Sequence, residues 1–271
     1  MRRARSPADV LVTVDAGRLW RAEQLGFFQP VKSAVLEARI PASFREANGL
    51  WYGFSLRARL IAYNKAKVKP EELPAYETLA DPKWKGRICT RSGTHDYNVG
   101  LTAAVLAHHD AAYTESWLQG VKANLARKPD CGDRDQVKAI WAGECDIAVG
   151  NTYYMGQMLA DPEQKAWAES VNVVFPTFEA GGTHMNISGV AMTKSAPHKE
   201  AALKLMEWLS SDAAQKIYAE TNHEFPVKPG VARSALVASW GEFTPDSLPL
   251  ADVAAKRADA LKLIETVDFD N

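Results

Sequence analysis

Three tyrosines lie where predicted strands pass into predicted helices. Tyr153 and Tyr154 follow the apolar run 146–149, which is typical of a buried strand, and a helical pattern begins directly after them. Tyr97 follows a second such run and precedes a helical pattern over 99–108. Side chains that diverge on a regular strand can converge where the backbone bends into a helix. The two phenols of the tyrosine pair can therefore address one small ligand.

Paired phenols suit a hard, highly charged cation. A phenol has a pKa of about 10, so a neutral ligand does not require two phenols to ionise side by side. Fe³⁺ favours anionic oxygen donors and displaces phenolic protons, which makes its binding weaker in acid. Taken alone, Tyr153 and Tyr154 are also explained as packing or interface aromatics. Because Tyr97 supplies a third phenol, we predict a ferric site formed by Tyr97, Tyr153 and Tyr154.

The loop before the helix at 99–108 predicts an anion site. The backbone amides of Ser92, Gly93 and Thr94 lie close to a helix N-terminus, where N–H groups attract anions. Arg57, in a strand-like stretch, could present its guanidinium to the same anion, and Arg59 is the weaker candidate for that role. The alternatives are an ordinary turn for the loop and a surface ion pair for each arginine.

Composition limits the class of protein. A chain of 271 residues with 46% hydrophobic residues exceeds one simple domain and favours two lobes. The 32 Lys+Arg and 33 Asp+Glu residues provide no basic field for nucleic acid or an anionic membrane. No stretch approaches the roughly 20 apolar residues of a membrane span. The start, Met1 to Pro7, is basic but has no apolar core, so no signal peptide is present as written.

Short apolar runs alternate with longer amphipathic stretches, which is typical of an α/β protein. Strands followed by helices predict a largely parallel, doubly wound arrangement, with ligands outside the carboxyl ends of the strands. Gly26 is expected just after the end of the first helix. The predicted strands are 9–14, two pieces within 51–64, 87–90, 146–149, 173–175 and 186–192; the predicted helices are 16–25, 99–108, one from 197 through 209, 213–218 and 248–266.

The remaining reactive residues form no recognisable catalytic pattern. Three cysteines are too few for a disulfide framework; one bridge, with Cys131 to Cys145 the favoured pairing, leaves Cys89 free. Nucleotide-binding and hydrolase motifs are absent from the sequence, which disfavours an enzyme. The pair His108-His109 is better explained by a solvated helix end than by a metal site. His184 and Glu224 could border a ligand, with a turn and a solvated loop as their alternatives.

A set of short motifs occurs in order along nearly the whole chain. Its members are Ser-Pro-Ala-Asp-Val-Leu at 6–11, Trp-Tyr-Gly at 51–53, Arg-Ala-Arg at 57–59, Tyr-Asn at 63–64, Asp-Pro-Lys-Trp-Lys-Gly-Arg at 81–87, Gly-Asn-Thr-Tyr-Tyr at 150–154, Asn-Ile-Ser-Gly at 186–189 and Glu-Phe-Pro-Val at 224–227. This ordered set resembles the ferric-ion-binding periplasmic proteins. The resemblance implies an α/β type II periplasmic binding protein, with two doubly wound lobes, a hinge and an interlobe cleft.

The resemblance also implies roles for individual residues. By position, Tyr153 and Tyr154 match the paired iron ligands of the family, and Tyr97 matches the third tyrosine of one subgroup. Arg57 matches an arginine that helps a carbonate or another synergistic anion to complete the site. We therefore expect a periplasmic monomer that is not an enzyme, does not bind nucleic acid, captures Fe³⁺ and delivers it to an ABC permease in the inner membrane. Release would follow cleft opening, reduction or protonation of the phenolates.

The expected lobes are made of separate stretches of chain. Lobe 1 comprises 1–57 and 185–235, lobe 2 comprises 58–184, and the C-terminal helices 236–271 are expected to pack on lobe 2. Relatives begin with a further segment, about one β-α-β unit, that carries a His or Tyr iron ligand, and here Met1 lies directly before the first shared motif. We expect unpaired apolar surface and reduced stability as a result. Val14 stands where some relatives carry a glutamate ligand, which favours coordination by tyrosines.

Three alternatives stay open at this point. The first is a type II receptor for another solute, an oxyanion or a small organic molecule, in which the tyrosines only line the pocket. The second is a non-haem iron enzyme, which would need more histidine ligands than the sequence offers. The third is a fragment that binds nothing because its first strand is missing.

Overall fold

The computed structural model describes residues 6–271. The basic start from Met1 to Arg5, where no signal peptide is predicted, lies outside the described residues. Within 6–271, no helix combines the length and the apolar character needed to cross a bilayer. The chain divides into two compact units, of which the first comprises Met1–Arg57, Asn186–Ala235 and Pro249–Ala255, and the second Ala58–Met185, Leu236–Leu248 and Lys256–Asn271.

The first unit is built around short antiparallel pairings. Strand β1 (Val10–Val14) pairs with β6 (Met185–Met192), with Val10 opposite Met192 and Val14 opposite Ser188. Helix α1 (Ala16–Gln24) begins where the Asp15 side chain accepts a bond from the Gly17 amide at 2.8 Å, and ends before Gly26 at φ 67°, as predicted. The other elements are α2 (Ala34–Arg39), the first half of β2 (Tyr52–Asn64), α8 (Lys199–Leu209), α9 (Asp212–Thr221), β7 (Phe225–Pro226) and α11 (Leu250–Ala255).

Strand β1 exposes apolar side chains. Among the described residues it is the end strand of its sheet, with β6 as its one neighbour. Leu11 is 37% exposed and Val12 56% exposed, and Leu25 and Phe27 line an apolar groove beside them. Strand β1 therefore presents apolar side chains at the end of its sheet, whereas the unpaired surface and the loss of stability expected from a missing segment stay predictions.

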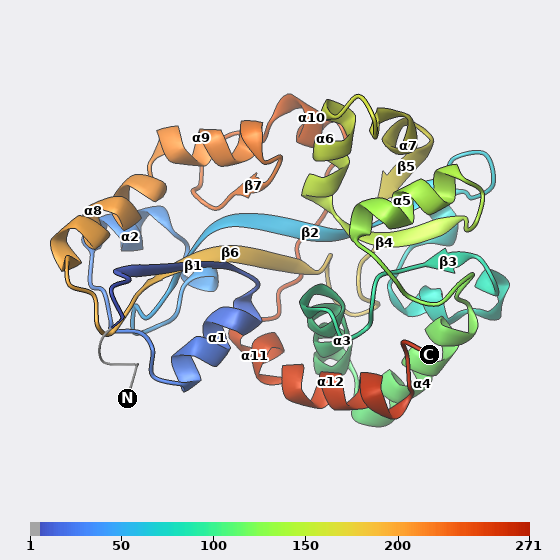
Figure 1. The fold of residues 1–271 in the computed structure, drawn as a ribbon, viewed down its shortest axis with the longest axis horizontal. Helices are drawn as coiled ribbons and strands as arrows, with labels where there is room; N and C mark the ends of the chain where they lie inside the picture. The colour runs from blue at the N-terminus through green and yellow to red at the C-terminus, as the bar shows by residue number, and fades with distance from the viewer. Residues whose placement is uncertain (1–5) are drawn as a thin grey trace. The chain divides into compact units, whose positions relative to one another are not determined.

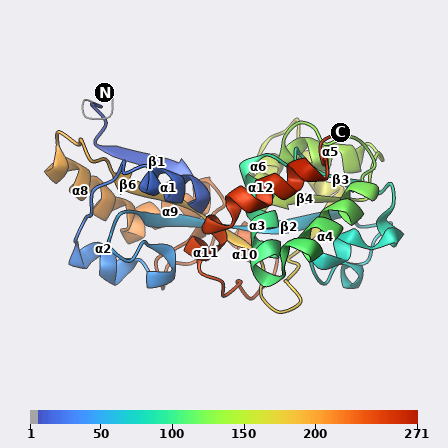
Figure 2. The same cartoon turned by 90° about the horizontal axis from the view of Figure 1, so that it is seen from below.

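The second unit surrounds a short mixed sheet. Strand β4 (Ile147–Asn151) lies between the second half of β2, which is antiparallel to it, and β3 (Ile88–Cys89), which is parallel. Strand β5 (Val171–Val174) also pairs with β2. Figure 1 shows α3 and α5 on opposite sides of β4, and Figure 2 shows α12 running beside α3. The helices are α3 (Asp96–His108), α4 (Ala111–Ala123), α5 (Asp133–Trp141), α6 (Thr152–Ala160), α7 (Lys165–Glu169) and α12 (Arg257–Thr266).

Three sequence predictions about the elements were wrong. The stretch 51–64 forms one continuous strand, β2, because nearly all its residues are buried and no turn residue interrupts it. The described pairings are mostly antiparallel, since β2 runs opposite to β4, β5 and β7. The predicted helix 248–266 is two helices, and the first, α11, packs on α1. For that reason Pro249–Ala255 belongs to the first unit, instead of packing on the second with the other C-terminal helices.

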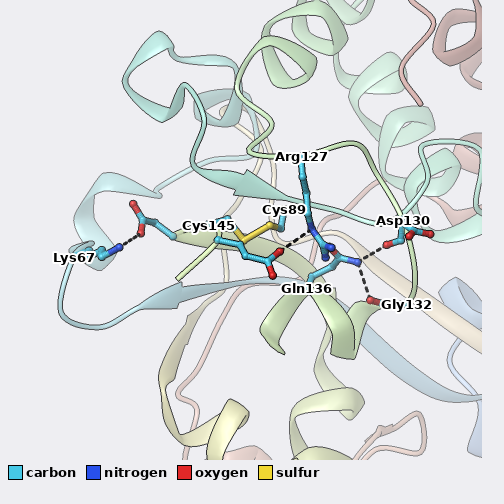
Figure 3. Close-up of a disulfide and its surroundings, with 9 residues drawn as sticks. Lys67, Cys89, Arg127, Asp130, Gly132, Gln136 and Cys145 are labelled. Carbon is cyan, nitrogen blue, oxygen red and sulfur yellow. Dashed lines mark hydrogen bonds and ion pairs between the residues drawn. A yellow bond between two sulfur atoms is a disulfide. The ribbon is translucent and has the colours of Figure 1, made fainter. Parts of the chain in front are cut away.

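The disulfide joins Cys89 to Cys145 and leaves Cys131 as an exposed free thiol, so the predicted Cys131 to Cys145 pairing was wrong. Cys89 ends β3 and Cys145 lies just before the neighbouring strand β4, which brings their Cα atoms to 5.9 Å. Figure 3 shows the bridge beside Arg127 and Gln136, which hydrogen-bond to each other at 3.1 Å. Both bridged cysteines are buried, so the bridge is part of the core of the second unit.

Candidate functional site

Parallel pairing brings the three tyrosines together in the second unit. Because β3 and β4 are parallel, with Ile88 opposite Ile147, their carboxyl ends lie at the same edge of the sheet. Helix α3 follows the first strand and carries Tyr97 in its first turn, while α6 follows the second and carries Tyr153 and Tyr154 in its first turn. This edge is where an α/β sheet offers a ligand site.

The phenol groups are in direct contact. The hydroxyl oxygens of Tyr97 and Tyr153 are 3.0 Å apart and share a hydrogen bond. The rings of Tyr153 and Tyr154 also pack against each other, with their centroids 4.2 Å apart. Tyr97 is buried, whereas the other two rings are half-buried. The structure thus brings together all three tyrosines that the sequence singles out.

Ionisation of these phenols is costly without a cation. Burial, and next the neighbouring Tyr97, raise the pKa of Tyr153 well above the ordinary value of a phenol. A hydroxyl in this cluster can therefore lose its proton and act as a phenolate only if a cation binds to the oxygen in place of that proton. The ligand that fits this exchange is a small, highly charged cation that prefers oxygen.

A buried cluster of charged groups lies beside the tyrosines. Asp133 accepts a hydrogen bond from Arg59 at 2.8 Å and another from Arg91 at 3.1 Å. The guanidinium carbons of Arg59 and Arg91 lie 5.8 Å and 5.3 Å from the ring centroid of Tyr97. One carboxylate shared by two guanidinium groups leaves one positive charge in surplus. A nearby positive charge favours the ionised form of a phenol and so opposes part of the burial cost.

Two asparagines complete this cluster. Asn98 accepts from Arg59 at 2.5 Å and donates its amide to the carbonyl of Arg91 at 2.9 Å. Asn151 occupies the N-cap position of α6, but its side-chain oxygen accepts from Arg59 at 3.2 Å instead of capping the helix. Sequence reasoning missed Asp133, Arg91 and Asn98. Asp133 stands in the polar run 132–135, which reads as an ordinary helix start and contains no sign of burial.

His95 connects the same loop to Tyr97. Its Nδ1 accepts a hydrogen bond from the Tyr97 amide at 3.2 Å and caps α3, and its ring contacts the Tyr97 ring edge-on at 4.6 Å. Burial, and next the charge of Arg91, lower the pKa of His95 to about 4. The imidazole is therefore neutral at pH 7, as its acceptor role requires.

The predicted anion-binding residues already have partners. Ser92, Gly93 and Thr94 lie in the loop that carries Tyr97, as expected, but they hold the carboxylate of Asp270. Arg57 is buried in the first unit, where it donates to Ser188 at 2.8 Å and to the carbonyl of Ile187 at 2.6 Å. Of the two arginines, Arg59 is thus the one beside a tyrosine of the site.

Other candidate residues have structural partners. His108 contacts Asp246 at 2.9 Å, and His109 contacts Glu77 at 2.9 Å. His184 is buried and its amide donates to Tyr76. Glu224 accepts from Ser55 in the first unit. Across residues 6–271, no group of three or more His, Cys, Asp or Glu side chains is arranged to hold a metal ion, which leaves the tyrosine cluster as the candidate.

Comparisons with known proteins identify the family of the chain. A family model described as bacterial extracellular solute-binding protein matches residues 5–239. Iron uptake protein A1 of Synechocystis sp. is 49% identical over 263 residues, which cover 96% of this chain and 73% of the relative. The solved apo ferric ion-binding protein A of Pasteurella haemolytica is 50% identical, with a TM-score of 0.94 over 98% of this chain and 84% of that one.

A further solved structure contains bound ligands. The Trichodesmium protein IdiA (FutA), in complex with iron and citrate, is 45% identical, with a TM-score of 0.95 over 99% of this chain and 85% of that chain. These likenesses confirm the predicted family and fold class. The chain belongs to the bacterial extracellular solute-binding proteins and has the α/β fold of the type II periplasmic binding proteins.

Proposed function

We propose that this chain is a periplasmic receptor that captures ferric iron through the phenolates of Tyr97, Tyr153 and Tyr154 and delivers it to an ABC importer. The observation that carries the proposal is the contact of the Tyr97 and Tyr153 hydroxyls at 3.0 Å, with the Tyr154 ring packed against the Tyr153 ring. Similarity to proteins whose names refer to iron uptake and to ferric-ion binding supports the same cargo. In this role the chain is a monomeric binding protein and not an enzyme.

The surrounding charges support a trivalent cargo. Fe³⁺ replaces the phenolic protons, and each phenolate then supplies an anionic oxygen. Arg59 and Arg91 together carry one more positive charge than Asp133 neutralises. This charge favours the phenolates while Fe³⁺ replaces the phenolic protons. Water, carbonate or another synergistic anion would fill the positions that the three tyrosines leave open on the ion.

The disulfide supports the periplasmic location. Cys89 and Cys145 are bridged inside the core of the second unit. Structural disulfides persist in oxidising compartments such as the periplasm and are rare in the cytosol. A receptor that hands iron to a permease in the inner membrane would work in that compartment.

Titration with ferric nitrilotriacetate tests the proposal. Wild-type protein should develop a visible phenolate-to-iron charge-transfer band that saturates at one iron per chain. Tyr153→Phe and Tyr97→Phe should each abolish the band or weaken iron binding at least about 100-fold, since each removes one anionic donor. The matched control is Tyr113→Phe, which alters a more exposed tyrosine on α4 and should leave the band unchanged.

The acid response gives a second readout. As the pH falls, protons compete with Fe³⁺ for the phenolates, so the band should weaken in acid, and the high pKa of free Tyr153 strengthens this competition. A wild-type chain that binds iron with no visible band, or a Tyr153→Phe variant with an unchanged band, would refute the tyrosine assignment.

A further inference from the structure

The loop between β3 and α3 holds a carboxylate from the C-terminal part of the chain. The Gly93 amide donates to Asp270 Oδ1 at 2.6 Å, and the Ser92 hydroxyl donates to Asp270 Oδ2 at 2.5 Å. The Thr94 hydroxyl donates more weakly to Oδ2 at 3.4 Å. These three residues are the ones in which the sequence predicts an anion site. A carboxylate of the chain itself therefore uses the donors that an external anion would need.

Packing holds this carboxylate in place. A Cβ atom added to Gly93 would lie 2.7 Å from Phe269 Cδ1 and 3.0 Å from Ile264 Cγ2, so α12 and the residues after it press directly on the loop. The Lys122 side chain also bonds to the carbonyl of Asp268 at 2.5 Å. Because these contacts fix the neighbours of Asp270, its carboxylate is tethered at high effective concentration.

A second tie joins the same two segments. Arg257, at the start of α12, donates to the Asp96 carbonyl at 2.9 Å and to the Asp96 carboxylate at 2.6 Å. Asp96 directly precedes Tyr97. The loop is therefore held on both sides, by Asp270 at Ser92–Thr94 and by Arg257 at the first residue of α3.

We infer that Asp270 is a built-in anion that takes the place of an external synergistic anion at Ser92, Gly93 and Thr94. This inference rests on the proposed function and concerns the anion requirement of the same site. The carboxylate compensates the partial positive charge at the N-terminus of α3 and accepts the hydrogen bonds that the loop donates. An external anion can occupy this loop only by displacing a tethered carboxylate, so iron capture at the tyrosines does not depend on one there.

Inorganic phosphate is the probe that tests Asp270. In buffer freed of bicarbonate and phosphate, wild-type protein should bind ferric iron with the same affinity whether or not phosphate is then added. Asp270→Asn should bind iron about tenfold more weakly in that buffer, because the loop loses its fixed charge. Phosphate should restore the binding of this variant. Asp270→Glu keeps the charge and should stay insensitive to phosphate, and Asp268→Asn, in the same turn, is the matched control.

Calorimetry on iron-free protein separates this inference from the iron proposal. Phosphate should release or absorb heat on binding to Asp270→Asn and give no binding signal with the wild type. Phosphate binding to iron-free wild type as tight as to Asp270→Asn would overturn the inference, even if the charge-transfer band is present. Absence of the charge-transfer band in the wild type would instead refute the iron proposal. The comparison of phosphate binding to iron-free wild type and Asp270→Asn would still test the role of Asp270. Should Asp270→Asn fail to fold, the wild-type phosphate titration and Asp270→Glu still decide it.

Discussion

Arg57 and Arg59 are two residues apart on β2, both are buried, and each is bound within a different unit. In the first unit, Arg57 has its own carboxylate, Glu224 at 3.5 Å, together with neutral oxygens of Ser188 and Ile187. In the second unit, Arg59 shares the carboxylate of Asp133 with Arg91. The same residue type on one strand is thus neutralised in one unit and left with surplus charge beside Tyr97 in the other. The number of carboxylates available to each guanidinium group, and not the residue type, therefore decides which arginine can assist a phenolate.

The largest expected effect comes from removing the carboxylate of each cluster. Asp133→Ala leaves the buried Arg59 and the partly buried Arg91 without an anionic partner and should destabilise the protein by roughly 3–5 kcal/mol. Glu224→Ala should cost less, about 1–3 kcal/mol, because Arg57 keeps its two closer neutral acceptors. Urea unfolding of the iron-free variants at pH 7 measures both. A larger loss of unfolding free energy in Glu224→Ala than in Asp133→Ala would show that Arg57 depends on its carboxylate more than Arg59 and Arg91 depend on theirs.

The second expected effect is confined to the unit that carries the disulfide. Replacing Cys89 and Cys145 together by alanine opens a loop with a sequence separation of 56 residues and should cost about 2–4 kcal/mol. The measurement is urea unfolding without reductant, and wild type in excess dithiothreitol should approach the variant. Cys131→Ala is the control and should unfold like the wild type, since its thiol is free and exposed.

Replacing Arg57 and Arg59 one at a time by lysine tests how much each arginine contributes to ferric binding. Lysine retains the charge but cannot reach Asp133, Asn98 and Asn151 together, as the Arg59 guanidinium does. We expect Arg59→Lys to weaken ferric binding about tenfold and to shift the charge-transfer band, and Arg57→Lys to have a smaller effect. Equal effects would argue that Arg57 also serves the site, as the sequence first suggests.

The smallest expected effect concerns His95 in the iron-free protein. Its pKa is lowered to about 4 in the folded state, against about 6.5 for the ordinary group. Between these values the unfolded chain binds a proton that the folded chain does not, so His95 lowers stability as the pH falls from about 6.5 towards 4. His95→Asn keeps a side-chain oxygen for the N-cap and removes the titration.

The variant should therefore lose less stability than the wild type between pH 7 and pH 5, by less than about 1 kcal/mol because the group is only half-buried. Thermal unfolding at both values measures the difference. Identical losses in the two proteins would exclude a contribution from this histidine.

Local pattern sufficed for much of the fold and for the three tyrosines. Apolar runs that end in polar junctions predicted β4 and α6 and hence the position of Tyr153 and Tyr154, and the ordered motifs predicted the family. The continuous strand β2 was missed because its central arginines interrupt the apolar pattern, although they are buried by distant partners. The antiparallel direction of that strand has no local signature at all.

The chemistry of the site was determined by the sequence, because phenols are chosen by residue type and their place after strands follows from short-range periodicity. The tertiary structure alone decided which charges serve them. Asp133 lies 74 positions from Arg59, and Asp270 lies 177 positions from Gly93. It also decided that Cys145 meets Cys89 and not Cys131. Contacts between residues so far apart depend on how strands pair and helices pack, and a carboxylate in a polar run looks the same whether it ends in water or beneath two guanidinium groups.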